Sequence, residues 1–402
     1  MTERLPLSGI RVVDFSWIIA GPTCARILAL MGAEVLKVES HRRPDPSRRG
    51  GGAGFHMLNQ GKKSITLNLS TTRGLELAKQ LISVSDVVIE NFATGVIERL
   101  GLGYDVLKEL RPDIVMVSSS GLGHTGPDQS HVAYGTLLQC FTGWSAQTGF
   151  PGKSPLIGGA WTDPLTGMMQ AFVIASTLHH RSESGTGQYV DFSMAETTST
   201  LLPEAIMEYA MNGRVAERIG NNDELYSPND LYPCQGDDNW VAIAVTSDEE
   251  WKGLCDVIGR EDFGEDKLLV TMAGRRNMSV EIDQAIRNWT MTVTKAEAMH
   301  RLQGAGVPAG PSQTASDVFD DPHLDARGFF HTHRSADGRD VRIVSVPWQF
   351  QNGPAPKNGR APELGEHSSD ILGGILGISG DEIETLVGEQ VIYWEATDLT
   401  NL

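Results

Sequence analysis

The sequence predicts an α/β protein whose larger part is a doubly wound parallel sheet and whose smaller part is an α+β domain. Strand and helix signals alternate through the first hundred residues, and a polar break at residues 220–224 separates a second region. The chain has 402 residues, more than one ordinary core holds. We therefore expect two domains, with ligands bound outside the carboxyl ends of the parallel strands.

The first repeat of this sheet is the clearest. Residues 10–15 form a short apolar strand, Ala20-Gly21-Pro22 turn the chain, residues 23–31 predict a helix and residues 35–39 a second strand. Such a repeat gives parallel strands with a right-handed connection. The turn has one glycine, so the G-x-G-x-x-G fingerprint of nicotinamide and flavin enzymes is missing.

The alternation continues along the chain. Further strands are expected at residues 64–69, 86–90, 114–119 and 188–192, and helices at 72–83, 95–100, 164–180 and 195–211. Past the polar break, a strand at 240–245 and helices at 248–258, 275–290 and 295–304 predict the smaller domain, which ends at the sharp break 306–311. Strand signals at 341–346 and a helix at 381–388 indicate a tail that returns to the first domain.

The composition excludes several classes of protein. With 33 Lys and Arg against 51 Asp and Glu, the net charge of -18 repels nucleic acid and anionic membranes. No apolar run has membrane-spanning length, and Met1-Thr2-Glu3-Arg4 is not a signal-peptide pattern. The four cysteines show no C-x-x-C spacing, and the histidine pairs are poor metal sites. We expect a reduced, cytoplasmic protein without a metal site.

One local charge cluster runs against the net charge. Arg42, Arg43, Arg48 and Arg49 follow the first strand-helix-strand repeat. The cluster suits a phosphate, and a solvated loop explains it equally well. Both interpretations stay open at this point.

Asp163 stands at the start of the long predicted helix, in the stretch Trp161-Thr162-Asp163-Pro164-Leu165-Thr166-Gly167. Aspartate followed by proline at a helix start is typical of an N-cap with proline in the first helical position. From its local sequence alone, Asp163 is expected to cap the helix.

Several segments, taken in order, resemble one family. They are residues 7–15 with 20–22, 32–39, 59–64, 90–92 with 98–104, 187–194 and 306–311. Together they resemble the class III CoA-transferases, the family of formyl-CoA transferase, carnitine CoA-transferase and, more distantly, α-methylacyl-CoA racemase. The resemblance covers nearly the whole chain, to about residue 375.

The resemblance implies a particular domain plan. A Rossmann-like large domain would be built from residues 1–205 and 330–402, and the small α+β domain from residues 222–325, with linkers at 206–221 and 326–329. The family forms interlocked dimers, so the linkers would wrap around a partner, either a second copy or a paralogue.

The resemblance also implies a reaction. The family's catalytic aspartate corresponds to Asp163. It attacks a donor acyl-CoA to form a mixed anhydride, and the released CoA thiolate then gives an aspartyl-CoA thioester, which the acceptor acid resolves by the reverse steps. The carboxylate must be ionised, and a helix N-terminus would lower its pKa. Nearby N–H donors would stabilise the acyl oxygen. An acyl-CoA and an organic acid are the substrates, and no permanently bound cofactor is implied.

The implied CoA-binding positions are Ala20, Asn91, Phe92 and Arg99, with Tyr134 beside them. An arginine such as Arg99 suits a phosphate. Formyl-CoA transferase has an arginine and a lysine for CoA where this chain has Ser40 and Ser70, and Arg42 or Arg43 is a candidate replacement.

The implied acid pocket also departs from formyl-CoA transferase. That enzyme has a glutamine at the position of Ile19 and a glutamate at that of Gly135, and Trp17 lies nearby. The lost polar groups favour a larger, more apolar acid than oxalate. Trp144 and Trp161 either line the same pocket or are ordinary core aromatics.

Two alternatives to intermolecular transfer remain. A racemase needs a His-Asp pair opposite the equivalent of Asp163; Tyr134 and Gly135 occupy that place, with His131 three residues earlier. The chain would otherwise be one subunit of a heteromeric, benzylsuccinate-type CoA-transferase. The leading hypothesis is CoA transfer from a donor such as succinyl-CoA to a carboxylic acid.

Overall fold

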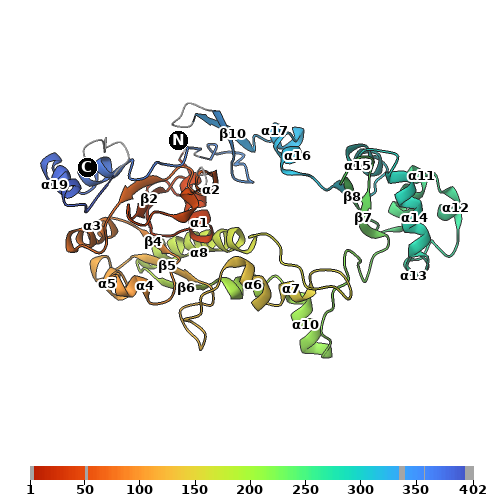
Figure 1. Ribbon diagram of the computed structural model, residues 1–402, viewed down its shortest axis with the longest axis horizontal. Helices are drawn as coiled ribbons and strands as arrows, with labels where there is room; N and C mark the ends of the chain where they lie inside the picture. The colour runs from red at the N-terminus through yellow and green to blue at the C-terminus, as the bar shows by residue number, and fades with distance from the viewer. Residues whose placement is uncertain (1–3, 50–52, 335–339, 357, 394–402) are drawn as a thin grey trace. The chain divides into compact units, whose positions relative to one another are not determined.

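The computed structural model describes residues 4–49, 53–334, 340–356 and 358–393 (Figure 1). The chain divides into two compact units. The larger unit comprises Met1–Ser145, Ile157–Arg214 and Leu324–Leu402, and the smaller comprises Ala146–Leu156 and Val215–His323. The finer boundaries given above stay predictions.

A six-stranded parallel sheet forms the centre of the larger unit. Its strands are β1 (Arg11–Asp14), β2 (Glu34–Glu39), β3 (Lys63–Thr66), β4 (Val87–Glu90), β5 (Val115–Ser120) and β6 (Tyr189–Ser193). They lie in the order β3-β2-β1-β4-β5-β6, and every neighbouring pair is parallel. The predicted α/β class and parallel sheet are confirmed. The strand order reverses between β1 and β4, which is where such sheets bind ligands.

Both faces of the sheet are buried, because alternate residues of each strand enter different cores. Val13, Leu36 and Val88 belong to the core shared with α3 (Thr72–Ser83), α18 (Ser368–Gly374) and α19 (Gly380–Gly388). Val12, Val35 and Val87 belong to the core shared with α1 (Ala20–Leu30) and α8 (Thr162–Ser184). This double burial explains why the strands read as continuous apolar runs.

The close packing of α1 on α8 sets the position of Asp163. A Cβ at Gly167 would lie 2.5 Å from the Ala20 carbonyl oxygen, so only glycine lets the two helices approach so closely. The first turn of α8, which carries Asp163, is thereby held beside the start of α1.

The end of the chain joins the large unit. The Gly61 N–H donates to the Arg360 carbonyl, and the Asn68 N–H to the Val391 carbonyl, each beside β3. A hairpin of β10 (Phe330–Arg334) and β11 (Asp340–Val344) precedes this contact. Residues far apart in sequence therefore build one unit.

The smaller unit has an antiparallel sheet of β7 (Asn229–Pro233), β8 (Trp240–Ala244) and β9 (Ala309–Pro311). Its core is centred on Trp251 and is closed by α11 (Asp248–Ile258), α14 (Ser279–Thr290) and α15 (Lys295–Gly304). Its shorter helices are α12 (Glu261–Glu265), α13 (Met272–Asn277) and α16 (Ala315–Phe319).

Several element predictions need correction. The single helix expected at 195–211 is two, α9 (Met194–Ser199) and α10 (Pro203–Asn212), because Pro203 lacks an N–H and disfavours helical backbone at the residue before it. The helix expected at 275–290 is likewise divided into α13 and α14. Several short helices were not predicted, among them α6 (Gly135–Phe141) and α7 (Trp144–Gln147).

None of the described helices is both long and apolar enough to cross a membrane. Among the described residues, no three His, Cys, Asp or Glu side chains are grouped to hold a metal ion.

Candidate active site

A cavity of about 890 Å³ opens at the carboxyl ends of the parallel strands, within the larger unit. Segments that follow five strands line it. They are residues 15–20 after β1, 38–43 with Pro46 after β2, 67–70 after β3, 91–94 with Val96 and Leu100 after β4, and 119–121 with the loop 129–135 after β5. Asp163 and Met194 complete the wall. The cavity lies where the strand order predicts a ligand site.

Most of the predicted site residues meet in this cavity. Asp163, Ala20, Asn91, Phe92, Arg42, Tyr134, Ile19, Trp17 and Gly135 all line it, together with Ser40 and Ser70. Arg99 does not: it is exposed at the end of α4 (Val96–Arg99). Trp144 and Trp161 pack on each other, with ring centroids 4.5 Å apart, and do not line the cavity. The chemical role of each lining residue remains a proposal.

Asp163 differs in two respects from what its local sequence predicts. The N-cap of α8 is Trp161, so Asp163 lies inside the first turn and does not cap the helix. The expected lowering of its pKa is also wrong. Burial penalises the charged form and raises the pKa of Asp163 from 3.8 to about 6. At pH 7 about nine in ten molecules still carry the carboxylate.

Gly135 lies directly against Asp163. A Cβ at this position would be 2.7 Å from Asp163 Oδ2 and 2.5 Å from Thr162 Oγ1. Real Cβ atoms do not approach other atoms so closely, so the observed position of the carboxylate requires glycine here. A larger residue at this position cannot be accommodated without moving Asp163 or Thr162.

Asn91 supports the cavity wall through the backbone of Trp17. Its Oδ1 accepts from the Trp17 N–H at 2.7 Å, and its Nδ2 donates to the Trp17 carbonyl at 2.9 Å. Both ends of the amide are therefore occupied by protein. The Trp17 ring in turn lies edge-on to Phe92, with centroids 5.8 Å apart.

The arginines of the cluster at 42–49 have different surroundings. Arg42 and Arg43 line the cavity, and the Arg43 guanidinium lies 4.9 Å from the centre of the Trp17 ring. Arg48 instead makes two hydrogen bonds to Glu39, at 2.9 and 2.7 Å. A phosphate contact is therefore open to Arg42 and Arg43, whereas Arg48 is part of the fold.

Glu90 and His124 form a buried pair that the sequence reasoning missed. Glu90 Oε1 lies 3.9 Å from His124 Nε2, and the Phe92 N–H donates to Glu90 Oε2. Burial outweighs that hydrogen bond and raises the pKa of Glu90 to about 7. A charged residue at the last position of a wholly buried strand was the available signal.

Comparison with known proteins identifies the family of this chain. The family model described as CoA-transferase family III matches residues 7–368. Succinyl-CoA–D-citramalate CoA-transferase of Chloroflexus aurantiacus is 33% identical over 96% of this chain and 98% of that protein. The succinyl-CoA–L-malate CoA-transferase beta subunit of the same organism is 31% identical over 97% and 99%. A CAIB/BAIF family protein from Brucella suis superposes with a TM-score of 0.85 at 31% identity, covering 93% of this chain and 100% of that one. The chain therefore belongs to CoA-transferase family III.

Proposed function

We propose that this CoA-transferase moves CoA from an acyl-CoA to a carboxylic acid through covalent intermediates on Asp163. The observation that carries the proposal is the state of the two carboxylates lining the cavity. Both oxygens of Glu39 are bound by Arg48. Asp163 is desolvated and its raised pKa has no charge partner among its causes. A poorly solvated carboxylate that remains ionised is a competent nucleophile.

The proposed steps need no acid or base. Asp163 attacks the donor acyl carbon, the C–S bond breaks, and the CoA thiolate leaves a mixed anhydride. The thiolate attacks the aspartyl carbonyl and releases the donor acid, which gives an aspartyl-CoA thioester. The acceptor carboxylate attacks the aspartyl carbonyl of this thioester, the C–S bond breaks, and the thiolate leaves a second mixed anhydride. The thiolate then attacks the acceptor acyl carbon of this anhydride, which releases the new acyl-CoA and free Asp163. Each step exchanges one anionic nucleophile for one anionic leaving group.

The substrates are proposed from the relatives and the cavity wall. Both relatives named above act on succinyl-CoA, which supports succinyl-CoA as donor. Trp17, Ile18, Ile19, Val132 and Tyr134 line the cavity, which supports an acceptor larger and more apolar than oxalate. Assay of a panel of acids with succinyl-CoA and with acetyl-CoA would identify both partners.

Trapping tests the proposal. The protein is incubated with succinyl-CoA, then treated with hydroxylamine or borohydride, and the peptide containing Asp163 is analysed by mass spectrometry. Modification at Asp163, absent from the Asp163→Asn protein treated in the same way, is expected. An unmodified Asp163 in protein that is turning over would overturn the mechanism.

A racemase is the second candidate, because the structure adds one observation in its favour. His131 lines the cavity, and its Nδ1 lies 3.6 Å from Asp128 Oδ1. The pair is the combination a proton-transfer site uses. Incorporation of deuterium at the α-carbon of an acyl-CoA in heavy water, without an acceptor acid, would support racemisation. Its absence would exclude it.

We also propose that the chain assembles as an interlocked dimer, with a second copy or a paralogue. Met168 and Phe172 on α8, and Ile206, Met207 and Met211 on α10, are all more than half exposed. Large apolar side chains that are exposed in this way are typical of helices covered by a partner. Analytical ultracentrifugation of the purified chain would give a dimer mass if two copies suffice, and a monomer mass if a paralogue is required.

A further inference from the structure

The cavity wall after β1 contains a residue in an unfavourable backbone conformation. Ile18 has a φ of 68°. Among the described residues, the other non-glycine positions with positive φ are Asp238 and Gln390, so Ile18 is the β-branched one. The left-handed region is strained for a β-branched side chain, and such strain persists only where surrounding contacts impose it.

One buried ion pair holds the backbone that leads into Ile18. Asp45 Oδ1 accepts from the Ile18 N–H at 3.2 Å, and Asp45 Oδ2 lies 3.1 Å from Lys37 Nζ. Lys37 Nζ also donates to the carbonyl of Ser16 at 2.8 Å. The chain is therefore fixed before and after Trp17 by a single pair of side chains, both wholly buried.

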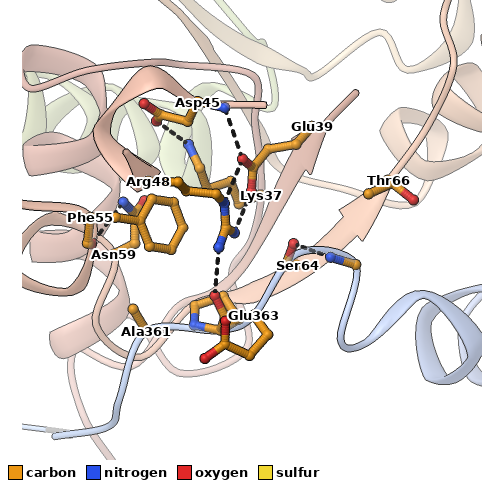
Figure 2. A network of polar contacts seen from close by, with 12 residues as sticks. Lys37, Glu39, Asp45, Arg48, Phe55, Asn59, Ser64, Thr66, Ala361 and Glu363 are labelled. Carbon is orange, nitrogen blue, oxygen red and sulfur yellow. Dashed lines mark hydrogen bonds and ion pairs between the residues drawn. The ribbon is translucent and has the colours of Figure 1, made fainter. Parts of the chain in front are cut away.

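The pair is anchored to the sheet and the neighbouring loop (Figure 2). The Asp45 N–H donates to Glu39 Oε1, and Glu39 holds Arg48. Burial alone would lower the pKa of Lys37, but the carboxylates of Asp14, Glu39 and Asp45 outweigh it and raise that pKa. Lys37 therefore stays charged at neutral pH, and the hydrogen bonds of the Lys37–Asp45 pair to Ser16 and Ile18 persist. We call this pair and its two backbone contacts the clamp.

The strained turn determines where two cavity side chains lie. Trp17 and Ile19 flank Ile18, and both line the cavity with it. Rotation of Ile18 to a negative φ would redirect the chain on either side, and with it the Trp17 ring that contacts Phe92 and Arg43. Ile19 is also the N-cap of α1, so the same rotation would disturb the start of that helix.

We propose that Asp45 and Lys37 are positioning residues, which hold the turn Trp17-Ile18-Ile19 in its left-handed form and so shape the wall of the cavity in which Asp163 reacts. They touch no substrate and act through the backbone of Ser16 and Ile18. The kinetic test of this proposal rests on the proposed function. Its second test, hydrogen exchange, does not depend on turnover.

The test is a double-mutant cycle with Ile18→Gly. Glycine adopts positive φ without strain, so it should keep the turn in place when the clamp is removed. The variants are Asp45→Ala, Ile18→Gly and the double variant, with kcat and KM measured for each. Asp86→Ala is the matched control, because Asp86, like Asp45, is a mostly buried carboxylate with cationic partners. It lies just before β4 and has no contact with the turn. Asp45→Asn and Asp86→Asn serve if an alanine variant does not fold.

We expect Asp45→Ala to lower kcat/KM by about 10- to 100-fold, since small misplacements of a reacting site have costs of this size. The double variant should return to the kcat/KM of Ile18→Gly alone, whereas Asp86→Ala should lose thermal stability and keep its kcat/KM. A double variant as slow as Asp45→Ala, or an equal kinetic loss in Asp86→Ala, would overturn the proposal.

Hydrogen exchange supplies the readout that does not depend on activity. The amides of residues 15–20 should exchange faster in Asp45→Ala than in Asp86→Ala at equal overall stability. Equal protection in the two variants would contradict the clamp even if the enzyme transfers CoA. If these amides exchange faster in Asp45→Ala but the unmodified protein transfers no CoA, the clamp is supported and the proposed function is rejected.

Discussion

The carboxylates at the two edges of the parallel sheet are compensated by cations to different degrees. At the amino edge, Asp86 accepts hydrogen bonds from Arg111 and Arg181 at 2.8 and 3.0 Å, so the carboxylate is fully compensated. At the carboxyl edge, Asp45 is paired with Lys37, but the half-buried Asp163 and the buried Glu90 have no cationic partner that outweighs desolvation, and both have raised pKa values. The strained Ile18 lies at this edge too. The amino edge stabilises its buried carboxylate, whereas the carboxyl edge holds desolvated carboxylates and a strained residue, as is common at catalytic sites.

Of the variants that test this comparison, Asp163→Asn should have the largest effect on activity. The amide is no nucleophile, so transfer should fall by about 10³-fold or more. Because the folded protein holds Asp163 at a pKa above its unfolded value, the ionised carboxylate costs stability at neutral pH, and that cost decreases as pH falls from about 6 and is gone below 3.8. The asparagine variant should therefore melt at the same or a higher temperature at pH 7. A large drop in both activity and melting temperature would contradict the assignment.

Gly135→Ala should have the second largest effect on activity. The added Cβ would displace the Asp163 carboxylate, and we expect kcat to fall by about 10²-fold, since misplacement of reacting groups has costs of this order. Gly159→Ala, at a glycine whose Cβ would meet no atom within 4 Å and whose φ is not positive, controls for the effect of a new methyl group shortly before α8. Similar losses in both variants would argue against contact with Asp163 as the cause.

The pH profile should show a smaller but specific change. If Asp163 must be ionised, kcat/KM should fall about tenfold per pH unit below about 6. The profile measured between pH 4.5 and 8, in steps of about half a unit, tests this. A rate independent of pH down to 4.5 would mean that the nucleophile is a carboxylate with an ordinary pKa.

The smallest predicted effect contrasts Glu90→Gln with Asp86→Asn. Glu90 has a folded pKa above its unfolded value, so its ionised form costs stability above pH 7, and the glutamine variant should gain about 1 kcal/mol there. Asp86→Asn removes a compensated charge and should lose about 2 kcal/mol. Urea denaturation at pH 8 measures both. Equal destabilisation would mean that the two edges do not differ as described.

The sequence predicted the sheet well because its strands are local, continuous apolar runs that alternate with helices. It also predicted Asp163 and most of the cavity wall, through motifs whose order along the chain is specific. It could not predict the pKa of Asp163, because burial by distant segments outweighs the local helix start. Nor could it reveal the clamp on Ile18, since Lys37 and Asp45 read as an ordinary strand residue and an ordinary turn residue. Arg99 is exposed and does not line the cavity, and its role in CoA binding stays a prediction.

The transfer of oxygen tests the central claim most directly. In the proposed cycle the bridging oxygen of the second anhydride comes from the acceptor acid and stays on Asp163 when the new acyl-CoA leaves. An acceptor labelled with oxygen-18 in its carboxylate should therefore place label in the Asp163 peptide and, over further turnovers, in the released donor acid. Turnover that leaves both Asp163 and the donor acid unlabelled would contradict an Asp163 anhydride.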